Sequence, residues 1–332
     1  MNSSLRRITV ESPARLHLGF VDLNGNIGRK FGSLGLALEG LSTQVIAEAT
    51  ADFHVVGDDS NRAQQYALRI LQAYGLPREL SLSVKSAIPT HAGLGSGTQL
   101  ALAIAKAISV LFGLNRDIRD LAQILGRGQR SGIGIGVFES GGFVFDGGHA
   151  AQTAVPPLLA RFEFPQHWWA VLVCDDKHQG LNGAAEITAF ESIQPMDQVV
   201  AAELCRLTLL GVFPALVERD FTSFSAHIAS IQEAVGTHFG PCQGGQFTSP
   251  VVADVMRWVG TRHNVIGVGQ TSWGPTGFAF VKGEARVLRI LEDLTSRFSD
   301  IAGLRFSAHR GCNHGAIIDR EERSNAGPMA TA

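Results

Sequence analysis

Two kinds of hydrophobic pattern divide this chain. Alternating or unbroken apolar stretches predict β-strands, and apolar residues spaced three and four apart predict helices. The strands are expected over residues 8–20, 34–49 (one or two strands), 80–84, 143–145, 168–174, 264–268, 277–281 and 304–308. The helices are expected over residues 62–74, 100–112, 118–125, 198–210, 224–235, 250–259 and 285–298. Strands and helices mix without strict alternation, which favours α+β domains over a doubly wound parallel sheet.

A stretch that opens on two prolines separates the pattern into two parts. Residues 156–165 lack a clear period, so we expect a linker there. We therefore predict an N-terminal domain over residues 1–155 and a C-terminal domain over residues 156–318. Residues 319–332 are charged and then small, which indicates a disordered tail. A length of 332 residues is enough for two ordinary domains or one large one.

The strongest local motif precedes the long apolar helix at 100–112. Its sequence from Pro89 is P-T-H-A-G-L-G-S-G-T. The three glycines let the backbone turn tightly and expose its N–H groups, and Thr98 is placed to cap the helix. Such a helix start favours an anion, typically phosphate; a turn that merely begins a core helix is the alternative. The expected phosphate-binding residues are Gly93, Leu94, Gly95, Ser96, Gly97 and Thr98.

Three further glycine-rich loops, at 28–35, 126–136 and 269–277, carry cations or hydroxyl groups. Loops often carry function on a rigid frame, and a ligand rich in negative oxygens would use several of them. Arg15 and His17 share one face of the first strand, as a solvated edge or as a pair that binds an anion. The loop at 126–136 carries Arg127 and Arg130 as its cations. The candidate cations for such a ligand are Arg15, His17, Arg29, Lys30, Arg130, Lys177 and His178.

A magnesium ion bound beside phosphate oxygens needs one or two carboxylates. Asp175 and Asp176 follow a predicted buried strand, where they are either metal ligands or ordinary solvated acids. The other candidate carboxylates are Asp22, Glu139 and Glu186.

Composition narrows the class of function. A net charge of −2 provides no overall electrostatic attraction for nucleic acid or for an anionic membrane. The four cysteines lie far apart without a C-x-x-C motif, which argues against a zinc site or a disulfide framework and suits the cytoplasm. No run of 18 apolar residues occurs, and no apolar segment follows the basic N-terminus, so neither a membrane span nor a signal peptide is expected.

The loop at Pro89 resembles the phosphate loop of the GHMP superfamily, which includes galactokinase, homoserine kinase and mevalonate kinase. Three motifs occur in the superfamily's order, in the regions 15–38, 89–98 and 269–277. The resemblance covers most of the chain and implies an N-terminal phosphate-loop domain and a C-terminal ferredoxin-like α+β domain, with the site between them. Gly97 stands where the superfamily usually has a second serine. Two further features differ from the kinases: Ser131-Gly-Ile-Gly-Ile-Gly has no acid before Glu139, and the third motif reads Gly269-Gln-Thr-Ser-Trp-Gly-Pro-Thr-Gly where the kinases have a stretch rich in Gly and Ala.

Longer motifs resemble one branch of that superfamily, the β-ribofuranosylaminobenzene 5'-phosphate synthases. They are Arg15-Leu-His-Leu, Asp22-Leu-Asn-Gly-x-Ile-Gly-Arg, Gly128-Gln-Arg-Ser-Gly-Ile-Gly, Phe138-Glu-x-Gly-Gly-Phe-x-x-Asp-Gly-Gly and Gly269-Gln-x-Ser-Trp-Gly-Pro-Thr. The resemblance implies an enzyme that joins 4-aminobenzoate to phosphoribosyl pyrophosphate with loss of pyrophosphate and CO₂, toward tetrahydromethanopterin-type one-carbon cofactors. An ATP-dependent GHMP kinase is the alternative, and a non-catalytic sensor of a phosphorylated ligand is a third reading.

The same resemblance implies roles for individual residues. Magnesium is the expected cofactor, the substrates are small molecules, and a homodimer is expected. Trp273 would stack on the aromatic ring, or else pin its loop to the core. The expected catalytic residues are Arg15, His17, Arg130 and Lys177, and the expected substrate-binding residues are Asp22, Asn24, Ser131, Gly132, Gln270, Ser272, Trp273 and Thr276.

Overall fold

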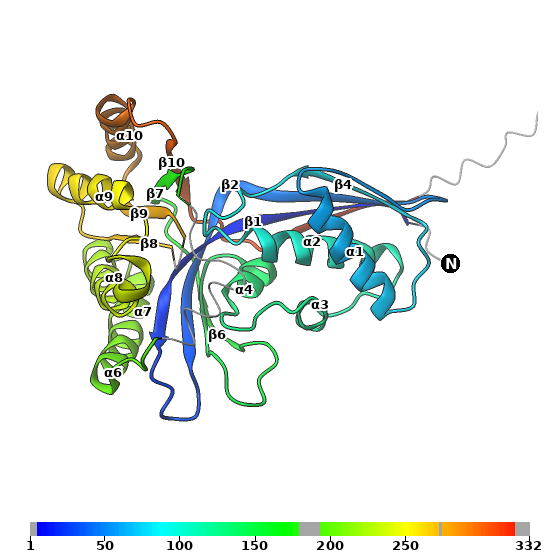
Figure 1. The fold of residues 1–332 in the computed structure, drawn as a ribbon, viewed down its shortest axis with the longest axis horizontal. Helices are drawn as coiled ribbons and strands as arrows, with labels where there is room; N and C mark the ends of the chain where they lie inside the picture. Colours follow the sequence, from blue (N-terminus) through cyan, green and yellow to red (C-terminus); the bar gives the residue numbers. More distant parts are fainter. Residues whose placement is uncertain (1–4, 179–192, 272–273, 323–332) are drawn as a thin grey trace, which may run out of the picture.

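The computed structural model describes residues 5–178, 193–271 and 274–322 of the chain. Two sheets and their helices make up this part (Figure 1). The elements are β1 (Leu5–Asp22), β2 (Phe31–Ala49), β3 (His54–Gly57), α1 (Ser60–Ala73), β4 (Leu80–Ser86), α2 (Ser96–Leu111), α3 (Ile118–Ile124), α4 (Ile133–Ser140), β5 (Phe143–Asp146), β6 (Leu158–Phe162), β7 (Trp168–Asp175), α6 (Gln198–Leu207), η1 (Thr208–Val212), α7 (Phe213–Glu218), α8 (Phe221–Gln243), α9 (Pro250–His263), β8 (Val268–Gln270), β9 (Thr276–Lys282), α10 (Glu284–Phe298), β10 (Leu304–Arg310) and β11 (Ile317–Glu322).

The first sheet is built on the long antiparallel pair β1 and β2. Its seven strands run in the order β11-β1-β2-β4-β3, with β5 and β6 added beside the first half of β2. Apolar residues of α1, α2 and α3 form one core with Ile8, Val45 and Leu82 of the sheet. These helices lie together on one face of the sheet (Figure 1). Alternate side chains of β1, such as Ile8 and Val10, therefore face these helices, which include α2 after the glycine-rich loop.

The second sheet has four antiparallel strands in the order β10-β7-β9-β8. Along the chain, β7 is followed by the helices from α6 to α9, then by β8, β9, α10 and β10. This is the expected β-α-β-β-α-β order of a ferredoxin-like domain, with several helices in place of the first one. The unbroken apolar run of β7 is explained by burial on both faces. Trp168 and Leu172 belong to the core shared with β1 and α8, whereas Val171 and Val173 pack with α9 and α10.

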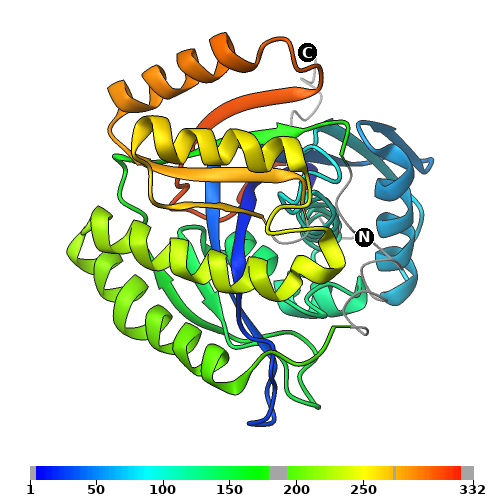
Figure 2. The ribbon, with the colours of Figure 1, turned by 60° about the vertical axis from the view of Figure 1, so that its left-hand side comes forward.

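Helix α8 lies across the β1–β2 pair and joins the two halves of the molecule (Figure 2). Phe224, Ile228 and Ile231 of α8 share one core with Leu16 and Leu18 of β1. The two sheets therefore share a continuous hydrophobic core, and the elements around the glycine-rich loops are held in fixed relative positions.

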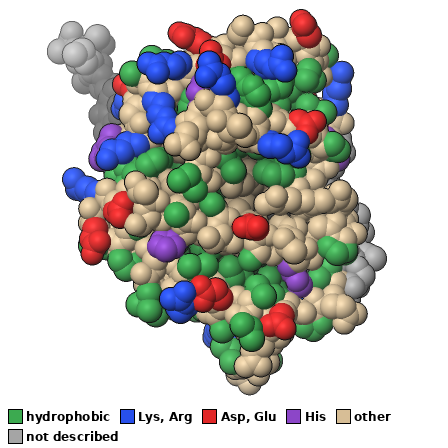
Figure 3. Space-filling model, turned by 90° about the vertical axis from the view of Figure 1, so that its left-hand side faces the viewer, with side chains coloured by type: hydrophobic (Ala, Val, Ile, Leu, Met, Phe, Trp, Pro, Cys, Tyr) green, Lys and Arg blue, Asp and Glu red, His purple; other side chains and the backbone are tan. Residues whose placement is uncertain are grey.

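One continuous helical segment, Gln198–Glu218, is long and apolar enough to cross a membrane by length and composition, with 39% of its most apolar window buried. It comprises α6, the π-helical turn η1 and α7. Its inner side packs on β1 and α8. Its outer side exposes Val199, Leu209, Leu210 and Val217. Figure 3 shows the side of the molecule that lies on the left in Figure 1, where hydrophobic side chains are interspersed with polar ones. The segment contains the ion pair Glu203–Arg206.

The domain limits predicted from the sequence differ from the sheets at two places. The predicted linker at 156–165 contains β6, which pairs with β5 of the first sheet. The predicted disordered tail is wrong at its start, because Asp319–Glu322 belong to β11 and pair with β1. Residues 323–332 lie outside the described residues. The four cysteines are free, as expected.

Two local predictions in this part of the fold need correction. Residues 133–140, expected within a loop, form α4 despite two glycines. A Cβ on Gly134 would lie 2.8 Å from Thr98 Cγ2, and one on Gly136 would lie 3.0 Å from Leu158 Cδ1, so close packing explains both glycines. The strand expected at 264–268 begins only at Val268, because Asn264 still caps α9. The stretch at 34–49, expected as one or two strands, belongs to the single strand β2.

Candidate functional site: the glycine loop at the start of helix α2

The glycine loop ends in a helix start that no described side chain caps. Gly93 and Gly95 have positive φ angles of 72° and 84°, and Gly95 is the residue before the first turn of α2. The predicted cap, Thr98, is wrong: its N–H bonds back to the Gly95 carbonyl, within the helix. Among the described residues the N–H groups of Ser96 and Gly97 have no hydrogen-bond partner. The loop therefore presents the donors that an anion requires.

The loop packs directly on the residues before β9. A Cβ on Gly93 would lie 2.1 Å from Thr271 Oγ1 and 2.9 Å from the Cα of Gly274. The Thr276 hydroxyl, which is fully buried, donates to the Ala92 carbonyl at 2.8 Å. These contacts bring the second and third predicted motifs together. They also explain why glycine is needed at position 93, since both the φ angle and the space exclude a side chain.

Arg15 and His17 stand beside this loop on β1. Arg15 Nη1 donates to the Gly93 carbonyl at 2.5 Å, and the Arg15 backbone N–H donates to the Leu94 carbonyl at 3.0 Å. His17 is buried, and its Nδ1 accepts from the Gly19 N–H at 3.1 Å. Burial first, and then the Arg15 charge, hold the pKa of His17 well below its usual range. His17 is thus a neutral imidazole with Nδ1 unprotonated, and Arg15 supplies the positive charge.

Two further arginines approach the loop at Gly97, and sequence patterns did not single them out as one site. A Cβ on Gly97 would lie 3.5 Å from Arg62 Nη1 of α1 and 3.7 Å from Arg127 Nη1. Arg127 was expected only as a cation of its own loop, and Arg62 only as a member of a helix. The pattern could not find the pair, because 65 positions of chain separate two residues that meet only through packing of α1 on α2.

The third glycine-rich loop is arranged differently. Asp146, fully buried at the end of β5, accepts from the Gly132 N–H at 2.8 Å and from the Ser131 hydroxyl at 3.3 Å. Its other oxygen accepts from the Gly148 N–H at 2.8 Å. The donors of Ser131 and Gly132 at the start of α4 thus face a carboxylate of the chain itself. The first turn of α4 also contacts α2, where Gln99 Nε2 donates to the Gly134 carbonyl at 2.8 Å.

Similarity to known proteins identifies the family of this chain. The sequence model of the GHMP kinases N terminal domain matches residues 61–142. The chain is 34% identical, over 84% of its length and 89% of the relative, to a beta-ribofuranosylphenol 5'-phosphate synthase of Archaeoglobus fulgidus. The chain belongs to this synthase family. The family is a branch of the GHMP kinase superfamily, as the motifs predicted, and the chain is an enzyme of this type.

Solved structures agree on the fold. The homoserine kinase of Cytophaga hutchinsonii matches with a TM-score of 0.66 at 17% identity, over 96% of this chain and 99% of that one. A structure described as MDDEF in complex with MVAPP, AMPPCP and magnesium matches with a TM-score of 0.64 at 18% identity, over 96% and 100%. The GHMP kinase fold expected for the synthase family is therefore confirmed, and a protein of this fold binds magnesium.

Several residues that the synthase motifs suggested lie in structural contacts. Asp22 Oδ1 accepts from the N–H groups of Asn24 and Gly25 in the turn that follows β1, and Asn24 Nδ2 donates to the Met196 carbonyl at 2.6 Å. The exposed Lys177 runs along Gly303, where a Cβ would lie 2.9 Å from Lys177 Cγ. Arg29 donates to the carbonyls of Gly147 and Gly148.

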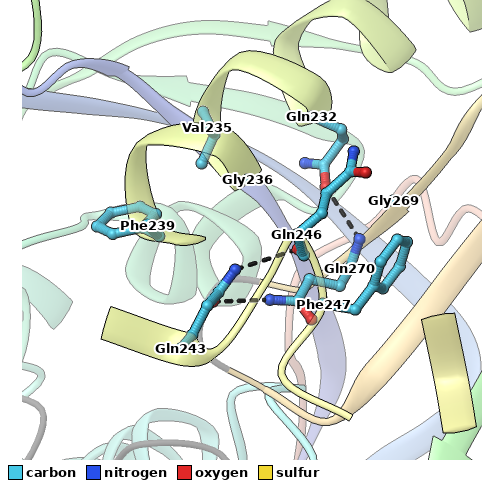
Figure 4. A pocket seen from close by; sticks show the side chains of 9 residues that line it. All are labelled: Gln232, Val235, Gly236, Phe239, Gln243, Gln246, Phe247, Gly269 and Gln270. Atoms are coloured by element: carbon cyan, nitrogen blue, oxygen red, sulfur yellow. Dashed lines mark hydrogen bonds between the residues drawn. The ribbon is translucent and has the colours of Figure 1, made fainter. Parts of the chain in front are cut away.

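Gln270 belongs to an amide network between α8 and β8. Its N–H donates to Gln232 Oε1, its Nε2 donates to Gln243 Oε1, and its Oε1 accepts from the Thr248 N–H. Figure 4 shows these side chains around a cavity of about 20 Å³, room for a single water molecule. Gln270 is thus committed to the protein on every polar atom. Ser272 and Trp273, its expected companions in substrate binding, lie outside the described residues.

The two carboxylates expected to bind a metal have protein partners. Asp175, which is buried, accepts from Ser249 Oγ at 2.7 Å and from the Lys177 N–H at 3.0 Å. Asp176 pairs with Arg305, whose hydrogen bonds hold the pKa of Asp176 below its usual range. A metal ion on this pair would have to displace these partners. In the described part of the chain, no three His, Cys, Asp or Glu side chains gather as a metal site.

Arg130 is half-buried in the loop before α4. Lys30 lies over the Phe31 ring at 5.8 Å from its centre. Glu139, the first acid after the Ser131-Gly132 pair, lies near the C-terminal end of α4 and pairs with Arg119 at 2.9 Å. Glu186 lies outside the described residues, and His178 is half-buried at their edge.

Proposed function

We propose that this enzyme condenses phosphoribosyl pyrophosphate with a para-substituted benzoate, losing pyrophosphate and CO₂, toward a tetrahydromethanopterin-type cofactor. One observation carries the choice of a synthase over a kinase. The site around α2 offers cations and N–H donors for anionic oxygens, but the start of α4 offers no free acid: Ile133 and Ile135 are buried, and Glu139 pairs with Arg119. Among the described residues this anion site has no positioned base, which suits a reaction that transfers no proton from its nucleophile.

The proposed reaction balances without a base. The bond between C1 of the ribose and the pyrophosphate oxygen breaks, and the leaving oxygen keeps the electron pair. The ring carbon that bears the carboxylate forms a bond to C1. The bond from that ring carbon to the carboxylate then breaks, CO₂ leaves, and its electron pair restores the aromatic ring. The negative charge lost with the carboxylate reappears on pyrophosphate, so stabilisation of that charge is the main demand on the protein.

The residues at the loop meet this demand. Arg15 and the N–H groups of Ser96 and Gly97 would bind anionic oxygens of the donor. His17, neutral and buried next to Arg15, can offer a hydrogen bond without adding a charge. Arg130 and Lys177 remain proposed contacts for the substrate carboxylate or 5'-phosphate, and Trp273 for the aromatic ring. The loop itself contributes hydroxyl and amide groups but no carboxylate, so magnesium would be held mainly through pyrophosphate oxygens, where it neutralises the leaving charge.

The aromatic acid is either 4-aminobenzoate, which the motif resemblance implies, or 4-hydroxybenzoate, which the product name of the Archaeoglobus relative supports. The test supplies each acid with a carboxyl label to the purified protein, with magnesium and phosphoribosyl pyrophosphate, and counts released CO₂. We expect release that depends on the phosphoribosyl donor and needs no ATP, with one acid preferred in kcat/KM. No release from either acid, with ADP formed from ATP and a small alcohol, would contradict the synthase reaction and support the alternative of an ATP-dependent kinase.

A homodimer and a cytoplasmic location stay predictions. Light scattering on the eluting protein checks the first, and fractionation of cells that express the native chain checks the second.

A further inference from the structure

Two guanidinium groups converge on the bare side of Gly97, in the first turn of α2. Both Arg62 Nη1 and Arg127 Nη1 lie within 4 Å of the point where a Cβ of residue 97 would stand. Gly97 has no side chain to fill that space. The α2 N–H groups of Ser96 and Gly97 belong to the same turn. Two like charges and a positive helix end thus share one location, which favours the binding of a negative ligand there.

Each arginine is held by hydrogen bonds from groups other than Nη1, and the Tyr66 hydroxyl lies 4.0 Å from the same Cβ position of residue 97. Arg62 uses Nε and Nη2 to bind Asp59 Oδ2, so Nη1 is left without a hydrogen-bond partner among the described residues. Arg127 uses Nη2 to bind the Tyr66 hydroxyl, and its guanidinium lies 5.1 Å from the centre of the Tyr66 ring. Asp59 and Tyr66 therefore orient the two arginines and leave the Nη1 groups for a ligand, an arrangement that lowers the entropy cost of binding.

The charge count at this location favours a ligand with more than one phosphoryl group. Asp59 balances Arg62, but the partner of Arg127 is a neutral phenol. Arg127 Nε is also buried without a partner in the described structure. A diphosphate can place one phosphoryl group on the α2 N–H groups and the other between the two guanidiniums, where charge-assisted hydrogen bonds are strongest.

We propose that Arg62 and Arg127 form the pyrophosphate subsite of the enzyme, on the Gly97 side of the loop. The proposal rests on the proposed function, because it assigns the leaving group of the phosphoribosyl donor to this subsite. Arg15 then serves the opposite side of the same turn, next to Gly93 and Gly95. Tyr66 is a positioning residue that acts through Arg127.

The test measures binding of inorganic pyrophosphate and, separately, of ribose 5-phosphate by calorimetry. The variants are Arg127→Gln, Tyr66→Phe and Gly97→Ser, and the control is Arg78→Gln, an exposed arginine between α1 and β4. Arg127→Gln should weaken pyrophosphate by about 10- to 100-fold, the loss of a hydrogen bond to a charged group. Tyr66→Phe should weaken it less, and ribose 5-phosphate should bind all variants as it binds the wild type.

Gly97→Ser keeps the test independent of folding. Gly97 does not have a positive φ and has no neighbour closer than 3.5 Å, so serine fits the empty protein and favours the helix slightly. Its side chain would occupy the space between the guanidiniums and should lower pyrophosphate affinity without lowering the unfolding midpoint. Wild-type pyrophosphate affinity in both Arg127→Gln and Gly97→Ser overturns the proposal, and so does a loss confined to ribose 5-phosphate.

The two levels of inference fail separately. Arginine-dependent pyrophosphate binding without CO₂ release from any acid leaves the subsite standing and removes the proposed reaction. Full CO₂ release by Arg127→Gln and Gly97→Ser, at unchanged KM for the phosphoribosyl donor, would support the proposed reaction and contradict the proposed subsite.

Discussion

The starts of helices α2 and α4 look alike in sequence and differ in what faces them. Each follows a glycine-rich loop and has a Ser-Gly pair at its start: Ser96-Gly97 are the first two residues of α2, and Ser131-Gly132 directly precede α4. At α4 the donors of that pair bind the buried carboxylate of Asp146. At α2 no described side chain caps the helix, and cations surround it. One helix start is neutralised by the chain, and the other is left for a ligand.

The comparison shows what a glycine-rich loop does and does not indicate. Both loops expose donors for an anion. The residue that decides between them is Asp146, which lies outside the glycine-rich loop, 14 residues after Gly132 at the end of β5. A loop becomes an external anion site only where the fold brings it no acid of its own. The two Ser-Gly pairs therefore provide similar hydrogen-bond donors. What each helix start does depends on which group accepts those hydrogen bonds.

The largest expected effect comes from removing the cation beside the open helix start. Arg15→Ala should lower kcat/KM of the condensation by about 100- to 1000-fold, as expected when one preorganised donor to a developing charge is lost. The effect should fall on turnover rather than on folding, because Arg15 is half-buried and its backbone bond to Leu94 remains. The measurement is steady-state CO₂ release against donor concentration, with the unfolding midpoint recorded for the same preparation.

Arg7→Ala serves as the matched control, because Arg7 lies on the same strand and pairs with Glu48 far from the loop. It should leave kcat/KM unchanged. Near-normal turnover in Arg15→Ala would show that the positive charge at the open loop is not used in catalysis, and the contrast between the two helix starts would then lose its functional meaning.

A second expected effect concerns the closed helix start. Asp146→Ala removes the acceptor for Gly132 N–H, Gly148 N–H and the Ser131 hydroxyl inside the protein. Unsatisfied buried donors cost free energy, so the free energy of unfolding should fall by about 3 kcal/mol. Urea denaturation checks this, with the exposed Asp52→Ala as the control that should change little. A loss below about 0.5 kcal/mol would mean that water replaces the carboxylate and that the helix start is not closed by Asp146.

Sequence patterns predicted the parts of this site that depend on local chemistry. The tight turn at Gly93 and Gly95, the apolar helix after it and the alternation that places Arg15 and His17 on one face all follow from short-range rules. The ferredoxin-like order of the second domain followed from the family resemblance and is confirmed by its strand pairing. In each case the sequence signal that supports the prediction lies within about 20 consecutive residues or within one motif.

The remaining features depend on long-range packing and could not be found this way. Strand β11 forms because Ile318 meets Val10 of β1 across nearly the whole chain, so its charged sequence looked like a tail. Helix α4 tolerates Gly134 because Thr98 of α2 packs against it. The Arg62–Arg127 pair at Gly97 has no spacing that a pattern could detect. Asp146 sits in a quoted motif, but only the fold shows which donors it accepts.

The smallest expected effect measures how strongly the closed helix start holds a negative charge. Burial raises the pKa of Asp146, and this outweighs the hydrogen bonds from Gly148, Gly132, Ser33 and Ser131 that lower it. The folded protein therefore keeps the Asp146 proton to a higher pH than the unfolded chain does. Wild-type stability gains from this group at low pH, and the gain is lost as the pH rises through the interval between the ordinary and the raised pKa.

Asp146→Asn has no proton to exchange and lacks this slope. The unfolding free energy of the wild type minus that of Asp146→Asn should therefore become more positive as the pH falls from 7 toward 4. Urea titrations of both proteins at each pH measure this difference. If the wild-type value minus the Asp146→Asn value instead falls toward acid pH, the α4 donors stabilise a charged carboxylate more than burial opposes it. The α4 start would then bind its own anion as firmly as we expect the α2 start to bind pyrophosphate, and the two loops would differ only in whose anion they hold.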